Sequence, residues 1–240
     1  MRFILAPIYR VWFYIAVFIA IVCVLPFILW SSRSPKYYLQ FFYWERIWAR
    51  IVLFLMGYRI KVNWEQKPER DGQYIICANH TSMLDIMLTL AIFPVPYLFI
   101  GKKELSKLPI FGYFYKKTNI LVDRSSLKSR KMTYQLAGEK LDEGLGVCIY
   151  PEGMAPRADI LLAPFKSGAF RLSASKGVTI IPATFYDCKR LLPYDNFRGK
   201  PGVLRVDVHP FLEPKEDSSE EADRLKSECY RIILQSLQQK

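Results

Sequence analysis

The chain has 240 residues, enough for one substantial domain with an appendage but too few for two average domains plus a membrane anchor. It is 51% hydrophobic and 15% aromatic and has a formal net charge of +12, which suits the apolar and anionic surface of a phospholipid membrane. No zinc-finger, helix-turn-helix or RNP-like pattern accompanies the charge, so we expect no nucleic-acid partner. The five cysteines form no Cys-x-x-Cys pair and no metal-ligand spacing, which favours a reducing compartment and no bound metal.

The N-terminal segment is long and apolar. Residues 11–30 contain no charged side chain and are interrupted only by Pro26. Twenty helical residues rise about 30 Å, the thickness of a bilayer's hydrocarbon core. The segment lacks a small-residue cleavage pattern, so we expect the mature protein to retain it. Basic residues flank both of its ends and therefore predict no orientation; they are Arg2, Arg10, Arg33 and Lys36.

The segment 37–58 is also rich in aromatic residues, but Glu45, Arg46 and Arg50 interrupt its apolar run. This mixture is more typical of an interfacial helix than of a spanning one, although an ordinary core helix remains an alternative. The two segments together predict either a hairpin that dips into one leaflet or a spanning helix followed by an interfacial one. We therefore expect membrane-anchoring helices at 1–57 and a second domain at 58–240.

From residue 58 onward, short apolar runs alternate with amphipathic patterns. We predict strands at 59–64, 74–78, 97–101, 119–122, 146–150, 178–185 and 203–208. We predict helices at 82–93, 125–143, 168–175 and 220–238, with a loop containing Pro109 and Gly112 between the third and fourth strands. This alternation indicates an α/β fold with a mixed central sheet covered by helices.

The most informative motif is Asn79-His80-Thr81-Ser82-Met83-Leu84-Asp85, directly after a predicted strand. Histidine moves protons near neutral pH, and a carboxylate beside it fixes its tautomer and stabilises its charged form. A spacing of five is too long for one helix face, but a loop leading into a helix would turn the two side chains toward each other. The alternative is a polar turn with a helix cap at Ser82.

A second motif places Pro151-Glu152-Gly153 directly after the predicted strand 146–150. Glycine permits backbone geometry that other residues avoid, and the carboxylate stands at the strand's end. We therefore predict that Glu152 lies on the same sheet edge as His80. A solvent-facing turn acid is the alternative.

Basic side chains follow two further strands. Lys102 and Lys103 follow one short apolar run, and Arg124 follows another. Arginine offers a planar fork for phosphate oxygens and lysine a point charge, so these three residues predict a phosphate site. Each of them alone is equally typical of a solvated surface.

Taken in order, these motifs resemble those of the membrane glycerolipid acyltransferases, especially the bacterial 1-acylglycerol-3-phosphate acyltransferases. Asn79, His80 and Asp85 match the family's Asn-His-x-x-x-x-Asp block. The remaining blocks are matched by Lys102, Glu104, Leu105, Pro109, Gly112 and Arg124, by Tyr150-Pro151-Glu152-Gly153, and by Ile180-Ile181-Pro182. The resemblance covers roughly residues 74 to 185 and extends in kind to the N-terminal segments.

The chain departs from the family after Gly153. It continues Met154-Ala155-Pro156-Arg157 where the family usually has Thr-Arg-Ser. Arg157 therefore stands two residues late, and either Lys166 or Arg171 is an alternative substitute for the motif arginine.

The resemblance implies transfer of a fatty acyl group from an acyl thioester to the free hydroxyl of 1-acylglycerol-3-phosphate, which yields phosphatidic acid. His80 and Asp85 are the implied catalytic pair, and Asn79 or backbone N–H groups would stabilise the oxyanion. Lys102, Lys103, Arg124 and Arg157 would hold the phosphate, while Glu152 and Gly153 would shape the acceptor site. The thioester, acyl-CoA or acyl-carrier protein, is a co-substrate, and no cofactor or metal is implied.

The same resemblance implies the bacterial inner membrane, with the active site on its cytoplasmic face. Other acceptors, such as glycerol-3-phosphate or a lyso-aminolipid, fit the motifs equally. A catalytically silent lipid-binding protein is a further alternative, supported by the altered third block but not by the intact His80–Asp85 pair. A serine hydrolase is disfavoured because the sequence has no Gly-x-Ser-x-Gly elbow.

Overall fold

The computed structural model describes residues 2–107, 111–123, 125–157, 159–194 and 198–239. Contacts within the chain divide it into two compact units. Unit 1 comprises Met1–Glu65, His80–Pro94 and Thr184–Val208, and unit 2 comprises Gln66–Asn79, Val95–Ala183 and His209–Lys240.

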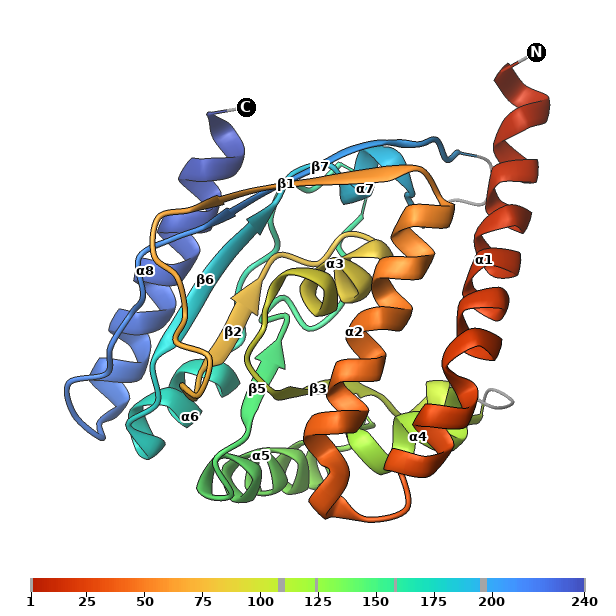
Figure 1. The fold of residues 1–240 in the computed structure, drawn as a ribbon. Coiled ribbons are helices and arrows are strands. Elements are labelled where there is room, and N and C mark those ends of the chain that lie inside the picture. Colours follow the sequence, from red (N-terminus) through yellow and green to blue (C-terminus); the bar gives the residue numbers. More distant parts are fainter. Residues whose placement is uncertain (1, 108–110, 124, 158, 195–197, 240) are drawn as a thin grey trace. The chain divides into compact units, whose positions relative to one another are not determined.

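The described residues form helices and strands that alternate along most of the chain (Figure 1). The helices are α1 (Arg2–Ser31), α2 (Tyr38–Leu55), α3 (Leu84–Ile92), α4 (Phe111–Thr118), α5 (Leu127–Asp142), α6 (Gly168–Lys176), α7 (Cys188–Leu191) and α8 (Ser219–Gln238), with 3₁₀ turns η1 (Pro35–Tyr37) and η2 (Lys103–Lys107). The strands are β1 (Tyr58–Trp64), β2 (Ile75–Ala78), β3 (Tyr97–Lys102), β4 (Ile120–Val122), β5 (Gly146–Ile149), β6 (Ile180–Phe185) and β7 (Gly202–Val208).

The strands form one mixed sheet, which confirms the predicted α/β fold. They hydrogen-bond in the order β1-β7-β6-β2-β5-β3-β4. β1 is parallel to β7, and the ladders that join β6, β2, β5, β3 and β4 are also parallel. β6 and β7 run antiparallel. Two hydrogen bonds show this: Tyr186 N donates to Arg205 O, and His209 N donates to Pro182 O.

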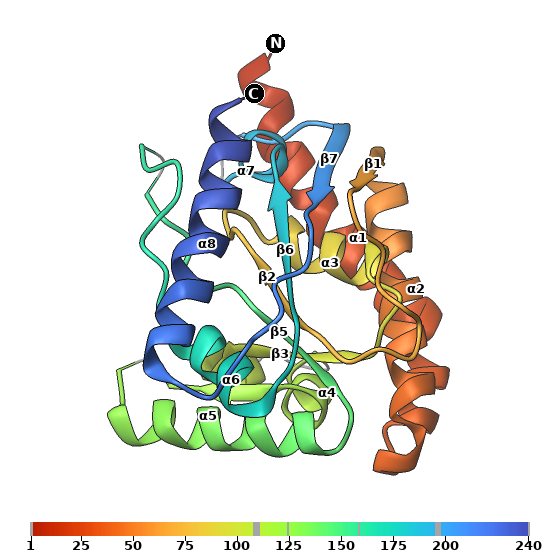
Figure 2. The same ribbon diagram turned by 90° about the vertical axis from the view of Figure 1, so that its left-hand side faces the viewer.

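Unit 2 has a core between its strands and three helices. All four residues of β2 are buried, as expected for an interior strand of a parallel sheet that is covered on both faces. α5 and α8 both pack against α6, and Figure 2 shows α6 beside α8. The core residues include Ile75, Cys77, Val147 and Ile180 from the strands and Ala137, Leu141, Phe170, Leu172, Leu225, Cys229 and Ile233 from the helices.

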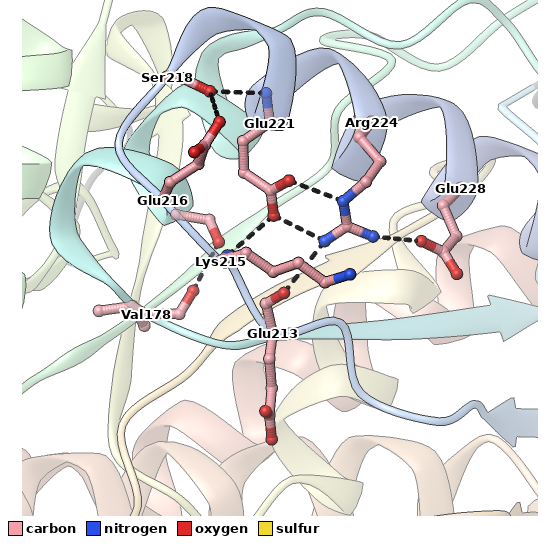
Figure 3. Close-up of polar contacts among 9 residues, drawn as sticks. Val178, Glu213, Lys215, Glu216, Ser218, Glu221, Arg224 and Glu228 are labelled. Carbon is pink, nitrogen blue, oxygen red and sulfur yellow. Dashed lines mark hydrogen bonds and ion pairs between the residues drawn. The ribbon is translucent and has the colours of Figure 1, made fainter.

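The N-terminus of α8 is held by a network of charged and polar groups (Figure 3). Ser218 is the N-cap, and its side chain accepts a hydrogen bond from Glu221 N at 3.1 Å. The Glu221 carboxylate accepts from Lys215 N at 2.9 Å and from the Arg224 guanidinium at 2.6 Å. The hydrogen bonds from Arg224 are the main reason that the pKa of Glu221 falls to about 2. This network fixes the start of the helix that covers the unit 2 core.

In unit 1, α1 and α2 pack side by side (Figure 1). The buried face of α1 repeats every three or four residues and includes two small residues that permit close helix approach; its members are Phe13, Ala16, Ala20, Val24 and Ile28. Hydrogen bonds close one end of the pair, where Tyr9 Oη donates to Met56 O at 2.6 Å and Trp12 Nε1 donates to Leu55 O at 2.9 Å.

The rest of α1 presents large apolar side chains outward. Its exposed members are Ile8, Val11, Trp12, Tyr14, Ile15, Phe18, Ile19, Val22, Phe27, Leu29 and Trp30. Residues Pro7–Ser31 are long and apolar enough to cross a membrane, with a mean hydropathy of 2.7. An apolar surface of this extent on one helix indicates membrane association.

The structure corrects the prediction of a loop around Gly112, because α4 begins at Phe111. Phe114 and Tyr115 are buried on this helix. A Cβ on Gly112 would lie 2.2 Å from Ser106 O, so only glycine allows α4 to approach the preceding turn this closely. α4 spans only eight residues, too few for a helical period to stand out in the sequence.

Candidate active site

The loop between β2 and α3 brings His80 and Asp85 together. His80 Nδ1 lies 3.0 Å from Asp85 Oδ2, which also accepts hydrogen bonds from Thr81 N at 2.5 Å and Ser82 N at 2.8 Å. Asp85 lies in the first turn of α3, where the helix dipole stabilises its negative charge. Because the carboxylate accepts at Nδ1, the neutral imidazole carries its proton there and presents Nε2 as a base.

Burial makes this pair rigid. The Asp85 side chain is fully buried, while 13% of the His80 side chain is exposed. Ser82 Oγ donates to Leu192 O at 2.5 Å and accepts from Leu84 N at 3.1 Å, which ties the loop to the segment after α7. The motif therefore combines a local turn and cap with a buried carboxylate that orients a partly exposed histidine.

Tyr194 adds a contact that no sequence pattern indicated. Its hydroxyl lies 3.4 Å from His80 Nε2, and the two rings meet edge to face with their centroids 6.3 Å apart. Tyr194 is 48% exposed. It thus lies beside the nitrogen that would receive a substrate proton.

In unit 2, several predicted site residues follow the carboxyl ends of parallel neighbouring strands. Asn79 follows β2, Glu152 follows β5, and Lys102 ends β3. Carboxyl ends of parallel strands share one sheet edge, where ligands bind in open α/β sheets. Asn79 and Glu152 are 1% and 3% exposed, while Lys102 is an exposed residue.

Glu152 fixes the segment that follows β5. Its Oε2 accepts a hydrogen bond from Ala163 N at 2.8 Å. Gly153 has φ +79°, a conformation that favours glycine. Lys166 N donates to Pro151 O at 2.8 Å, and a Cβ on Gly153 would lie 2.5 Å from Lys166 Nζ. The ammonium of Lys166 therefore lies directly against the Pro-Glu-Gly turn.

Arg157 is placed differently. Its side chain is 84% exposed and forms an ion pair with Asp159 at 3.3 Å. Among the three basic residues weighed after β5, which are Arg157, Lys166 and Arg171, Lys166 lies against the turn at Gly153. Arg171 is exposed on α6.

Lys102 and Lys103 form a second set of basic residues, at the end of β3. Lys103 begins η2 and is exposed. Hydrogen bonds from Ser125, together with the nearby Lys103 ammonium, lower the pKa of Asp123. Arg124, predicted as a phosphate ligand, lies outside the described residues.

Within the described ranges, no group of three or more His, Cys, Asp or Glu side chains is arranged to hold a metal ion. His209 is buried in unit 2, where its backbone N–H donates to Pro182 O at 3.0 Å.

Comparison with known proteins identifies the family of this chain. It is 27% identical over 238 residues to the 1-acyl-sn-glycerol-3-phosphate acyltransferases of Salmonella typhimurium and Escherichia coli K12, covering 98% of this chain and 91% of each relative. The crystal structure of the 1-acyl-sn-glycerophosphate (LPA) acyltransferase PlsC from Thermotoga maritima has the same fold, with a TM-score of 0.83 at 22% identity and coverage of 100% of this chain and 97% of that one. Residues 59–186 match the acyltransferase family, and the chain therefore belongs to it.

Proposed function

We propose that this acyltransferase moves a fatty acyl group from an acyl thioester to the free hydroxyl of 1-acylglycerol-3-phosphate, which forms phosphatidic acid. The observation that carries the proposal is the pair in which His80 Nδ1 meets the buried Asp85 carboxylate at 3.0 Å. The relatives that share nearly the full length of the chain are 1-acyl-sn-glycerol-3-phosphate acyltransferases, which supports this choice of acceptor.

In this reaction His80 Nε2 takes the proton of the acceptor hydroxyl as its oxygen attacks the thioester carbonyl. Asp85 stabilises the imidazolium that forms, as the carboxylate does in a hydrolase triad. Collapse of the tetrahedral intermediate breaks the C–S bond, and the departing thiolate takes the proton from His80. The acceptor hydroxyl fills the role of a catalytic serine, so no acyl-enzyme is needed. Asn79 or nearby backbone N–H groups would stabilise the oxyanion.

The acceptor phosphate needs cations, and we propose three lysines of unit 2 for this role. Lys102 and Lys103 stand at the end of β3, and Lys166 stands against the turn at Gly153. We propose that Lys166 takes the place of the motif arginine that the family usually has two residues before Arg157. Glu152 accepts a hydrogen bond from Ala163 N and so holds the loop that leads from Gly153 to Lys166. Arg124 remains a proposed phosphate ligand, and Arg157 is the alternative to Lys166.

We also propose that residues 1–57 anchor the enzyme as a hairpin in one leaflet. The outward apolar side chains of α1 favour lipid contact. In α2, Arg46 Nε donates to Leu90 O and an Arg50 nitrogen donates to Ala91 O, each at 3.1 Å. These contacts hold the second half of α2 against α3. Only the part of α2 before Arg46 lies outside these contacts, and that part is too short to cross a bilayer. For a bacterial cell we propose the cytoplasmic face of the inner membrane as the location of the site, as in the family that the motifs resemble.

The test is an acceptor panel. Purified protein in detergent is assayed with 1-acylglycerol-3-phosphate, glycerol-3-phosphate and a lyso-aminolipid, each with acyl-CoA and with acyl-carrier protein as the donor. The proposal predicts phosphatidic acid from 1-acylglycerol-3-phosphate at a kcat/KM well above that of the other acceptors. A preference for either other acceptor would overturn the substrate assignment, and the ratio between donors identifies the thioester used.

A further inference from the structure

Arg10 is the one charged residue in the apolar stretch Pro7–Ser31 of α1, and it is buried, with only 5% of its surface exposed. A buried guanidinium is costly unless hydrogen bonds satisfy it. Arg10 Nη2 donates to Pro193 O, in the segment that follows α7. Both residues belong to unit 1, so α1 holds a loop that lies 183 positions away along the chain.

Packing joins α1 to the same loop. A Cβ on Gly199 would lie 2.7 Å from Tyr9 Cδ1 and 3.3 Å from Leu192 Cδ1. The Tyr9 ring therefore lies against this loop, while its hydroxyl donates to Met56 O at 2.6 Å. The attachment of α1 to the loop thus has an apolar part as well as the hydrogen bond from Arg10.

The backbone of Leu192 and Pro193 is fixed on all sides. Leu192 N donates to Cys188 O at 2.9 Å, and Leu192 O accepts from Ser82 Oγ at 2.5 Å. Proline has no backbone N–H, so its carbonyl is the only backbone group through which Pro193 can be hydrogen-bonded. Arg10 holds that carbonyl. Every backbone hydrogen-bonding group of the two residues therefore has a partner.

The next residue is Tyr194, which lies beside the proposed base. Its hydroxyl is 3.4 Å from His80 Nε2, and its ring meets the imidazole edge to face with the centroids 6.3 Å apart. An acceptor hydroxyl must come within hydrogen-bond reach of Nε2, and it must do so beside this ring. The place of the ring therefore bears on how the acceptor is aligned.

We propose that Arg10 is a positioning residue for acyl transfer. Its hold on Pro193 sets where the Tyr194 ring lies, and this ring guides the acceptor hydroxyl to the base. The apolar helix α1 thereby contributes to the geometry of the site in addition to its role as an anchor. The proposal rests on the proposed function for its catalytic meaning, but the place of the Tyr194 ring can be measured without turnover.

The kinetic test is a double-variant cycle in the full chain. Arg10→Met removes the donors at similar side-chain length, and kcat at saturating acceptor should fall by about 10- to 100-fold, since small misplacements are costly. Arg10→Lys keeps a charged donor and should lose less. Tyr194→Ala, which removes the ring, should cost a factor similar to Arg10→Met. In the Tyr194→Ala background, Arg10→Met should lower kcat by less than about threefold further, because the ring that it positions is already gone.

Trp12→Phe is the matched control on the same helix. It removes another hydrogen bond from α1 to a backbone carbonyl, that of Leu55, and leaves the loop after α7 untouched. It should change kcat by less than about threefold. A purely structural role for Arg10 would lower kcat by the same factor with and without the Tyr194 ring. That result would overturn the proposal, as would an Arg10→Met variant with the kcat of the wild type.

The second readout is NMR of the full chain in detergent micelles with isotope-labelled histidine. The sequence has two histidines, so His209→Gln identifies the His80 resonances. Arg10→Met should shift the His80 ring resonances in the same direction as Tyr194→Ala does, and Trp12→Phe should leave them unchanged. Where Arg10→Met does not fold, Arg10→Lys, with its shorter reach, should give a smaller shift in that direction.

Unchanged His80 resonances in the folded Arg10 variant would overturn the proposal. A wild-type protein without turnover, in which these shifts nevertheless occur, would overturn the proposed function and leave the link from Arg10 to Tyr194 in place.

Discussion

His80 Nδ1 lies 3.0 Å from an Asp85 oxygen that also accepts hydrogen bonds from two backbone N–H groups, of Thr81 and Ser82. One carboxylate oxygen therefore orients the imidazole and fixes the turn between β2 and α3 at the same time. Removal of its charge must affect both the chemistry and the stability of the loop.

The first prediction concerns that charge. In Asp85→Asn the backbone donors retain an acceptor, but the imidazole loses the anion that fixes its tautomer and stabilises its charged form. We expect kcat to fall by about 10³–10⁴-fold. Measurement of kcat at saturating acceptor checks this, with thermal unfolding to show that the variant is folded. Activity within tenfold of the wild type would show that Asp85 has only a structural role.

The second prediction separates the candidate anion-binding residues. Lys166→Ala should raise KM for 1-acylglycerol-3-phosphate by about tenfold, the loss of one charge-assisted contact, and change kcat little. Arg157→Ala is the matched control and should change KM by less than about threefold, because an exposed ion pair contributes little. Steady-state kinetics over a range of acceptor concentrations distinguishes the two. A larger rise in KM for Arg157→Ala than for Lys166→Ala would assign the role of the motif arginine to Arg157.

The third prediction concerns Tyr194. Its hydroxyl at 3.4 Å from His80 Nε2 is a weak contact that an acceptor hydroxyl must replace. Tyr194→Phe should therefore leave kcat within about threefold of the wild type and lower the acceptor KM slightly. Separate determination of kcat and KM is the measurement. A loss of kcat comparable to that of a His80 variant would instead place the Tyr194 hydroxyl in the chemical step.

The fourth prediction is a pH dependence of stability. The pKa of Glu221 is lowered from 4.5 to about 2, so its ionised form stabilises the fold above pH 4.5, and this stabilisation is lost as the pH falls toward 2. Glu221→Gln should lower the free energy of unfolding by about 1–2 kcal/mol at pH 7, a value reduced because Arg224 is partly exposed. Near pH 2 the variant and the wild type should unfold at the same temperature.

Thermal unfolding as a function of pH checks this, with exposed Glu139→Gln as the control that should change stability by less than about 0.5 kcal/mol. A stability difference that is constant from pH 7 to pH 2 would show that the Glu221 charge is not the cause.

Most of the sheet was predictable because the strands are short apolar or alternating runs between polar turns, and interior ones such as Ile75–Ala78 are fully buried. The meeting of His80 and Asp85 was predictable too, since a loop entering a helix is the local geometry that brings positions five apart together. α7 was missed because its four residues contain no complete helical period.

Contacts over long sequence separations could not be predicted from local pattern. Tyr194 reaches His80 across 114 positions, and nothing in its neighbourhood distinguishes it from a surface tyrosine. Lys166 was predicted only as one of the possible substitutes for the motif arginine, because the contact that favours it depends on how the loop after Gly153 folds back.

The central claim, that His80 is the base, is tested most directly by substituting each of the two histidines of the chain in turn. Acyl transfer to 1-acylglycerol-3-phosphate is measured for His80→Ala and for His209→Gln, both purified and shown to be folded. His80→Ala should lose about 10²–10⁴-fold in kcat while His209→Gln keeps activity close to that of the wild type. Turnover in His80→Ala within tenfold of the wild type would contradict the assignment of His80 as the base.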